Sequence, residues 1–519
     1  MTHSPSLPRR SLIAALGVTA ALPWLGHVTP ALAAANDLTV GVPDNLTGLD
    51  PADVNDTLSQ SACRLIFQGL YGFDPDMKLV PVLAESYEAD ETAKVFTFKL
   101  RQGVTFHDGT PFNAEAVKVN FERVANPDNR LKRQSLLAML DRVEVVDPQT
   151  ARVHLKEPFG AFVNTIAHPA GMMLSPKAIA QFGKEINRNP VGTGPFTFVS
   201  WNADTLRTKK NEKYWRQGLP KVQSVTFRSV PENGARIAML QAGEAQFIYP
   251  LPTEMAPVVQ RSPNVEIVDK PSIIARYVSM NCMQKPFNDV RVRQALNHAV
   301  NKEAYAKIVY NGFAGPLDAP IPPKLGFYSK QDPYPYDVAK AKKLLAEAGY
   351  PNGFETEMWA NNNTLSQRGM QFMQQQLAAV GVKVTVLPME SGVLNDRIWS
   401  VQKPEDAQLK MYYGGWSSST GDADWGLRPL LWGQGFPPKL YNTAYYSNPE
   451  VDKALEAAIA TADPAKREEF YKQAQALIWK DAPWIFLGVE NVLSAQSKRL
   501  SGMYRIPDGG LLIEEAALS

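Results

Sequence analysis

The chain has 519 residues, and its 54 Lys and Arg residues nearly balance its 52 Asp and Glu residues. This balance argues against nucleic-acid binding, which needs a dense basic surface. The chain has only two Cys residues, which excludes a disulfide scaffold at this length; whether Cys63 and Cys282 form one bridge or remain separate buried thiols is left open by the sequence.

Residues 1–35 show the three-part pattern of a secretory signal peptide. Arg9 and Arg10 are positive, Leu12 to Leu25 is an apolar run, and Ala31 to Ala35 offers small residues for cleavage. The apolar run is shorter than the about 20 residues that a membrane-spanning helix needs. We therefore expect an exported, periplasmic protein, and the arginine pair leaves open a twin-arginine route of export.

Strands and helices alternate along the rest of the chain, which is typical of an α/β protein with open mixed sheets. Strands are recognised by alternating or short apolar runs; they are expected at Leu38–Val42, Val95–Arg101, Val143–Leu155 as a hairpin, Phe196–Trp201, Val222–Val230, Val382–Leu387 and Trp484–Leu487. Helices are recognised by caps and by apolar residues at helical spacing; they are expected from Asp56 or Thr57 to Leu70, after Asn113, and at Ala235–Gln241, Val290–Val300, Val338–Ala348, Gln367–Val380 and Asp463–Trp479.

The order of these elements suggests two lobes that the chain crosses twice. A crossover is expected near Lys270-Pro271, and the apolar strand that ends at Leu487 is the expected return. Two crossing strands form a hinge that suits closure around a ligand. The predicted division is a signal peptide at 1–35, lobe I at 36–270 with an inserted subdomain at about 57–185, lobe II at 271–487, and a return to lobe I at 488–519.

Motifs for catalysis or metal binding are weak. The six His residues have no ligand spacing, and no Gly-x-Ser-x-Gly elbow occurs. Asp422 and Asp424 are a candidate acid pair, although carboxylates two residues apart are common on solvated turns. We therefore expect no enzyme, no metal and no cofactor. A secreted hydrolase is the alternative from a different class, but the sequence shows no nucleophile–base pair for it.

Several blocks carry a family resemblance: Leu83–Tyr87, Phe98–Phe112, Val191–Phe196, Asn211–Trp215, Val290–Leu296 and Leu344–Phe354. On these blocks the chain resembles, over its whole mature length, the family 5 extracytoplasmic solute-binding proteins that feed peptide ABC importers. The resemblance implies a two-lobed periplasmic-binding-protein fold of type II, in the large peptide-binding subclass, with mixed sheets and a two-strand hinge. It also implies a monomer that binds its ligand between the lobes and delivers it to permease subunits in the inner membrane.

The block around Trp416 departs from the pattern of the peptide binders in this family. Those proteins carry an Asp three residues after the Trp, which pairs with the α-ammonium of the peptide. Here that position is Ser419. A buried ammonium needs a charged or well-hydrogen-bonded partner, so a standard peptide clamp is not expected. The block is most similar to the glutathione-binding members of the family, which implies glutathione as ligand; other di- or oligopeptides are the alternative, and nickel or haem a weaker one.

Glutathione has two carboxylates, one ammonium and one thiol, and carboxylates call for arginines or helix N-termini. The candidate ligand-binding residues that the resemblance implies are Asn55, Asp56 and Thr57 in the first lobe, and Arg276, Tyr277, Trp359, Arg368, Trp416, Ser417, Ser418, Ser419 and Asp422 in the second. Arg276 and Arg368 are the expected carboxylate binders, with a surface salt bridge as the alternative role of each. For Asp56 the alternative is a helix cap, and for the two tryptophans it is core packing.

Overall fold

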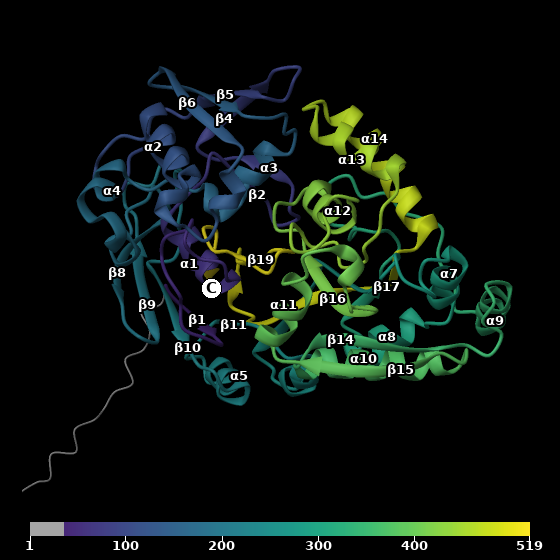
Figure 1. Cartoon of the computed structure of the whole chain (residues 1–519). Coiled ribbons are helices and arrows are strands. Elements are labelled where there is room, and N and C mark those ends of the chain that lie inside the picture. The colour runs from purple at the N-terminus through teal and green to yellow at the C-terminus, as the bar shows by residue number, and fades with distance from the viewer. Residues whose placement is uncertain (1–35) are drawn as a thin grey trace, which may run out of the picture. The chain divides into compact units, whose positions relative to one another are not determined.

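A mixed eleven-stranded sheet runs through residues 36–519, the part of the chain that this structure, a computed structural model, describes (Figure 1). From edge to edge its strands are β15 (Lys383–Met389), β14 (Glu355–Asn361), β16 (Met411–Ser417), β12 (Val265–Met280), β17 (Trp484–Ser497), β11 (Phe247–Ile248), β1 (Asp37–Val42), β10 (Ser224–Ser229), β9 (Thr205–Lys210) and β8 (Phe196–Trp201), while β13 (Ala314–Pro316) pairs with β17. The signal peptide predicted for residues 1–35 lies outside the described residues. Within 36–519, no helix is both long and apolar enough to cross a bilayer.

Two long strands, β12 and β17, run antiparallel through the middle of this sheet. The segment Val265–Pro271 pairs with Asn491–Ser497, and β11 lies beside that part of β17. The segment Ala275–Ser279 pairs with Trp484–Val489, and β16 lies on its other side. The register shifts between these two parts of the ladder. The shift lies where the sequence predicts the crossings between lobes; the lobe boundaries themselves stay a prediction.

A separate antiparallel sheet lies within the predicted subdomain, with the order β4 (Ala84–Ala89), β5 (Val95–Leu100), β7 (Thr150–Leu155) and β6 (Leu140–Asp147). The alternation in β5 has the expected result, because Phe96, Phe98 and Leu100 are all buried. The predicted hairpin that ends at Leu155 is confirmed as β6 and β7. Helix α2 (Ala114–Ala125) begins after its predicted cap, Asn113, whose side chain accepts a hydrogen bond from the amide of Ala116 at 3.1 Å.

The remaining strands form two-stranded sheets: β2 (Tyr71–Phe73) with β3 (Leu79–Pro81), β18 (Leu500–Ser501) with β21 (Ala517–Leu518), and β19 (Tyr504–Arg505) with β20 (Leu511–Leu512). The other helices are α1 (Thr57–Ile66), α3 (Phe162–Ala167), α4 (Pro176–Phe182), α5 (Asn233–Gln241), α6 (Ala256–Gln260), α7 (Val290–His298), α8 (Lys302–Val309), α9 (Val338–Glu347), α10 (Thr364–Ala378), α11 (Ser391–Trp399), α12 (Ala423–Leu431), α13 (Pro449–Ile459) and α14 (Pro464–Asp481). Helix α1 ends earlier than predicted, because Phe67 turns to an extended conformation and buries its ring in the core.

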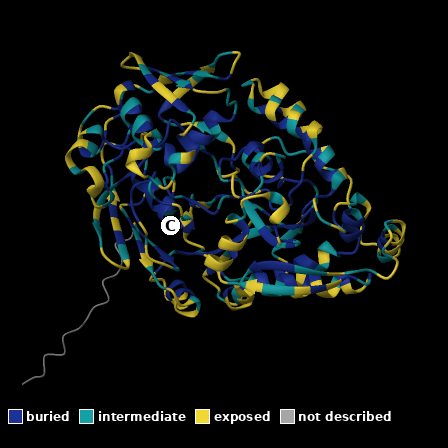
Figure 2. Cartoon of the chain, viewed as in Figure 1, coloured by how far each residue is buried: buried dark blue, intermediate teal, exposed yellow. Residues whose placement is uncertain are grey.

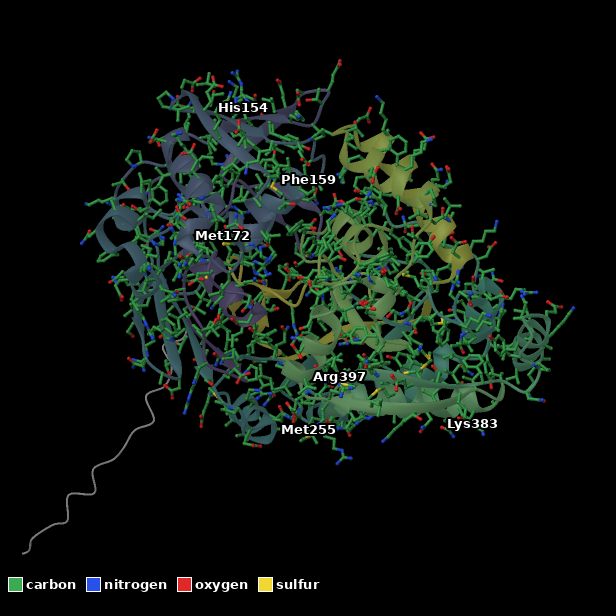
Figure 3. The ribbon with its side chains drawn as sticks, viewed as in Figure 1. His154, Phe159, Met172, Met255, Lys383 and Arg397 are labelled. Carbon is green, nitrogen blue, oxygen red and sulfur yellow. The ribbon has the colours of Figure 1, made fainter. Side chains whose placement is uncertain are left out.

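The largest buried cluster joins the subdomain sheet to the region of α12–α14, and Figure 2 shows the buried residues of these elements in dark blue. At this junction the amide of Gly160 donates a hydrogen bond to the carbonyl of Ile459 at 2.7 Å. Beside it, the guanidinium of Arg428 lies 5.9 Å from the ring centre of Phe159, the residue that Figure 3 labels. We call this contact, between 159–160 and 459–461 with Arg428, the latch. It connects the predicted subdomain to predicted lobe II.

Three histidines are held in surroundings that disfavour their charged form. Burial lowers the pKa of His107, His168 and His298, and that of His168 falls well below its ordinary value. The ring of His168 is fully enclosed, and its Nδ1 accepts a hydrogen bond from the amide of Ala170 at 3.1 Å. An unfolded histidine has a pKa of about 6.5, so between that pH and the lower folded pKa the unfolded chain binds more protons than the folded one.

We therefore expect the free energy of unfolding to fall as the pH decreases from 7 to 5, by up to about 1.4 kcal/mol per pH unit for each such histidine. The contribution is complete above pH ~6.5 and is lost on acidification. The variant His168→Gln keeps an acceptor for the amide of Ala170 and should lose less stability over this range than the wild type. Urea unfolding at pH 7 and pH 5 measures both proteins, and an equal pH dependence would contradict the expectation.

Candidate functional site

The first-lobe candidates lie at the start of α1. Asp56 is the cap of this helix: one carboxylate oxygen accepts a hydrogen bond from the amide of Ser59 at 2.7 Å, and the other accepts one from the hydroxyl of Thr47 at 2.6 Å. Asp56 thus has the role of helix cap that the sequence analysis named as its alternative. Asn55 and Thr57, on either side, are exposed, so their polar groups are open to a ligand.

Arg133 holds this loop in place and was not predicted from the sequence. Its guanidinium donates hydrogen bonds to the carbonyls of Val54, at 3.2 Å, and Asn55, at 2.9 Å. Burial lowers the pKa of Arg133, while Asp56 and Tyr441 act in the opposite direction. Tyr441, in predicted lobe II, thus acts on the same guanidinium that holds the first-lobe loop. No local pattern marked Arg133, which stands in an irregular segment.

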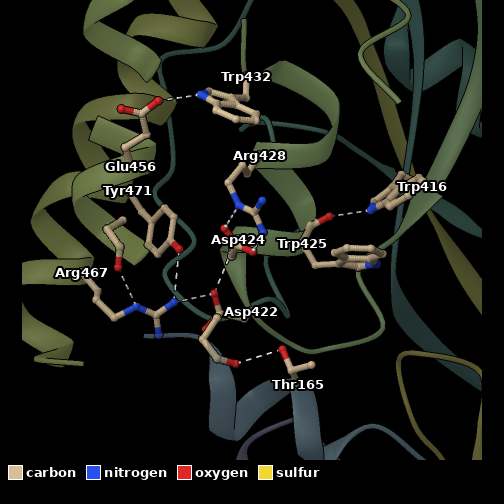
Figure 4. A network of polar contacts seen from close by, with 12 residues as sticks. Thr165, Trp416, Asp422, Asp424, Trp425, Arg428, Trp432, Glu456, Arg467 and Tyr471 are labelled. Carbon is tan, nitrogen blue, oxygen red and sulfur yellow. Dashed lines mark hydrogen bonds and ion pairs between the residues drawn. The ribbon is translucent and has the colours of Figure 1, made fainter. Parts of the chain in front are cut away.

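Trp416 belongs to an aromatic group at the end of β16. Its indole Nε1 donates a hydrogen bond to the carbonyl of Trp425 at 2.7 Å, and its ring centre lies 5.7 Å from that of Trp425 (Figure 4). The ring of Tyr441 is 5.0 Å away on the same tryptophan, and 40% of Tyr441 is exposed. Trp416 is half-buried, and its hydrogen bond and its two ring contacts hold it in place.

The serines that follow Trp416 differ in accessibility. Ser417 and Ser419 are half-buried, whereas Ser418 is buried. Asp422 is buried too: its carboxylate pairs with the guanidinium of Arg467 at 2.8 Å and caps α12 (Figure 4). Asp424 pairs with Arg428 in the same way, at 2.7 Å. The two carboxylates thus have separate cationic partners, which corrects the sequence-based hypothesis that they form an acid pair.

Arg276 forms an ion pair with a residue that the sequence analysis did not consider. Its Nε and Nη2 both lie 2.8 Å from Glu490 Oε2, and the hydroxyl of Tyr310 donates to the same oxygen at 3.1 Å. Burial lowers the pKa of Arg276, but the Glu490 carboxylate raises it, and the net shift is upward. The charge of Arg276 is therefore already compensated within the protein, by a largely buried salt bridge and not by the surface one named as its alternative.

The other three second-lobe candidates have mainly internal contacts. Arg368 is half-buried on α10 and donates to the carbonyl of Val309 at 3.1 Å. Tyr277 is buried and stacks on Trp484, with ring centres 3.9 Å apart. Trp359 is buried beneath the guanidinium of Arg397, whose carbon lies 5.6 Å from its ring centre. Trp359 thus has the core environment named as its alternative, and ligand contacts of these three residues stay a prediction.

A family model described as bacterial extracellular solute-binding proteins, family 5, Middle, matches residues 78–437. The chain belongs to this family. The glutathione-binding protein GsiB of Pectobacterium atrosepticum is 49% identical over 518 residues, which cover 99% of both chains. The structure of HbpA2 from Haemophilus parasuis is 28% identical with a TM-score of 0.85, over 93% of this chain and 100% of that one. DppA from Helicobacter pylori in complex with peptide STSA is 27% identical with a TM-score of 0.74, over 93% and 98%.

These neighbours confirm the predicted fold class of this solute-binding protein, a two-lobed α/β fold with mixed sheets. Its two thiols are not bridged: Cys63 is buried and Cys282 is half-buried, and both are free. Burial raises the pKa of Cys282 to about 11. Within residues 36–519, no group of three or more His, Cys, Asp and Glu side chains is arranged to hold a metal ion.

The solute-binding protein also contains a cavity of about 510 Å³ that none of the predicted site residues lines. It lies between the segment after α1 and the C-terminal segment. Polar side chains that line it form hydrogen bonds with one another. The indole of Trp215 donates to Gln68 at 2.9 Å, and the guanidinium of Arg216 donates to Glu514 at 2.9 Å. These bonds link walls that come from three distant parts of the chain.

Proposed function

We propose that this protein is the substrate-binding component of an ABC importer that takes up glutathione. It binds the tripeptide between lobe I and lobe II, in the periplasm, and delivers it to the permease subunits in the inner membrane. The observation that carries the proposal is the 49% identity to the glutathione-binding protein GsiB over 99% of both chains. Binding and delivery need no covalent step, so the protein acts as a carrier and not as an enzyme. The proposed carrier is a monomer.

The proposed site combines exposed polar groups with one aromatic wall. Asn55 and Thr57 contact the ligand from lobe I, and Ser417, Ser419 and the half-buried ring of Trp416 contact it from lobe II. Hydroxyl and amide groups at these positions satisfy the peptide bonds and the ammonium of glutathione without the aspartate that peptide binders use. Micromolar affinity corresponds to about −8 kcal/mol, which several charge-assisted hydrogen bonds in a closed site supply.

The lobe division proposed from the sequence supports a closing motion. β12 and β17 both run across the proposed boundary, and the register shift between Pro271 and Ala275 interrupts their ladder there. A ligand that contacts both lobes favours the closed arrangement by its differential affinity for that arrangement. Rotation about two strands leaves the core of each lobe intact.

We expect reduced glutathione to raise the melting temperature of the purified protein, because a ligand that binds only the folded state stabilises it by mass action. At a concentration of 100 times Kd the gain is about 2.7 kcal/mol. Calorimetry with glutathione, oxidised glutathione, a dipeptide, a tripeptide and nickel compares the alternatives, and mass spectrometry checks that the ligand is recovered unchanged. A melting temperature that rises with the dipeptide and not with glutathione would favour the peptide-binding alternative.

A further inference from the structure

Arg505, at the end of β19, is a half-buried cation with few internal partners. The C-terminal segment carries it back to the hinge strands, where Nη1 donates a hydrogen bond to the carbonyl of Leu493 on β17. The guanidinium carbon lies 5.1 Å from the ring centre of Tyr249. Within residues 36–519, Nε is buried without a hydrogen-bond partner. Of the five N–H donors of the guanidinium, one is thus used inside the described protein.

Other arginines that are largely buried here have carboxylate partners. Arg64 pairs with Asp508 at 3.0 Å, Arg276 with Glu490 at 2.8 Å, and Arg467 with Asp422 at 2.8 Å. Among the described residues, Arg505 has no carboxylate within ion-pair distance. Burial lowers the pKa of Arg505 to about 10, which leaves it charged at neutral pH. A guanidinium whose Nε is enclosed without a partner, and which has no counter-charge, is costly, so such an arrangement calls for a reason.

The position of Arg505 relates it to the proposed site. A Cβ atom built on Gly509 would lie 3.5 Å from Thr57 Cγ2 and 3.8 Å from Arg505 Nη2, so one glycine separates the two side chains. On the other side, Glu490, the partner of Arg276, acts on the pKa of Arg505. Arg505 therefore lies between a first-lobe candidate and the ion pair at the hinge. The carboxylates near it, Glu490 and Asp508, are paired with Arg276 and Arg64, so the charge of Arg505 is available to a ligand.

We propose that Arg505 binds one of the two carboxylates of glutathione through Nη2 and so acts as the anion anchor of the site. This inference rests on the proposed function and adds to it a specificity-determining residue. A carboxylate is the counter-ion that the guanidinium lacks, and arginine forms short charge-assisted bonds with it. Pairing with this cation gives an anionic tripeptide an advantage over a neutral ligand.

The test compares wild type, Arg505→Met and Arg505→Lys by calorimetry with glutathione. We expect Arg505→Met to weaken binding by about 10- to 100-fold, the usual loss of a buried charge-assisted bond, and Arg505→Lys to weaken it less. The matched control is Arg499→Met, an exposed arginine of the same C-terminal segment, whose removal should leave the affinity unchanged. Glutathione analogues that lack one carboxylate or the other identify the partner, because one of them should bind wild type and Arg505→Met equally.

A second readout separates anchoring from a structural role. Removing an unpaired, half-buried cation should leave the melting temperature without ligand equal or higher, while the rise caused by glutathione becomes smaller. A structural arginine would instead lower the melting temperature without ligand. If Arg505→Met binds glutathione as tightly as the wild type does, this inference alone is overturned. If the wild type does not bind glutathione, the proposed function is wrong and the inference with it.

Discussion

Replacement of Asp422 by Asn is expected to lower the free energy of unfolding by about 3–5 kcal/mol. The carboxylate and the guanidinium of Arg467 are only 1% and 5% exposed, so loss of one charge leaves the other buried and uncompensated. Asparagine still accepts the capping hydrogen bond from the amide of Asp424, which isolates the effect of charge. Urea unfolding monitored by circular dichroism measures the change.

Two further proteins make this prediction specific. Glu355→Gln breaks the ion pair with Lys383, in which both side chains are 78% exposed, and should change the stability by less than about 1 kcal/mol. The double replacement Asp422→Asn with Arg467→Gln removes both buried charges and should be less destabilised than Asp422→Asn alone. If Asp422→Asn costs no more than the Glu355 variant, the buried pair does not stabilise the α12–α14 region.

Replacement of Gly160 by Val is expected to weaken ligand binding by about tenfold or more. A Cβ atom at this position would lie 1.9 Å from the carbonyl oxygen of Thr461, far below the 3.0 Å limit of real contacts. The latch must therefore open, and its hydrogen bond from Gly160 to Ile459 is lost. We expect the latch to form part of the ligand-bound state, so the loss of one hydrogen bond and its surrounding contacts costs about 1.4 kcal/mol, which is tenfold in affinity.

Small-angle scattering provides the matching structural measurement. With saturating glutathione, the radius of gyration of Gly160→Val should stay larger than that of the wild type, because the subdomain and lobe II no longer close on each other. Gly234→Ala is the control: a Cβ atom at Gly234 meets nothing within 4 Å, so affinity and radius should not change. An unaltered affinity and radius in Gly160→Val would show that closure does not depend on the latch.

Local patterns were sufficient for most of the elements that the sequence analysis predicted, because their causes are local. The alternation in β5 and the caps Asn113, Asp337 and Asp463 act on residues within a few positions of each other, and the structure has strands and helices there. Where a distant contact determines the end of an element, the local pattern was misleading. Helix α1 ends early because Phe67 packs into the core.

The site depends far more on distant contacts, which no periodicity reveals. Arg276 meets Glu490 from a strand 214 residues further along the chain. Asp422 meets Arg467, which lies 45 residues away, so a carboxylate that looked available on a loop is buried. Arg505 carries no sequence signal at all, because its significance arises from the carboxylate that it lacks. The resemblance supplied the positions of the candidates, while their charge states and partners came only from the folded chain.

The place of β17 in the large sheet has a consequence for the order in which the chain can fold. β11 and β12 follow one another in sequence, yet β17 lies between them and is the last long strand to be synthesised. Until it arrives, both neighbours present unpaired edges in the centre of the sheet, which are prone to incorrect pairing. The large sheet therefore cannot be completed until nearly the whole length of the chain has emerged.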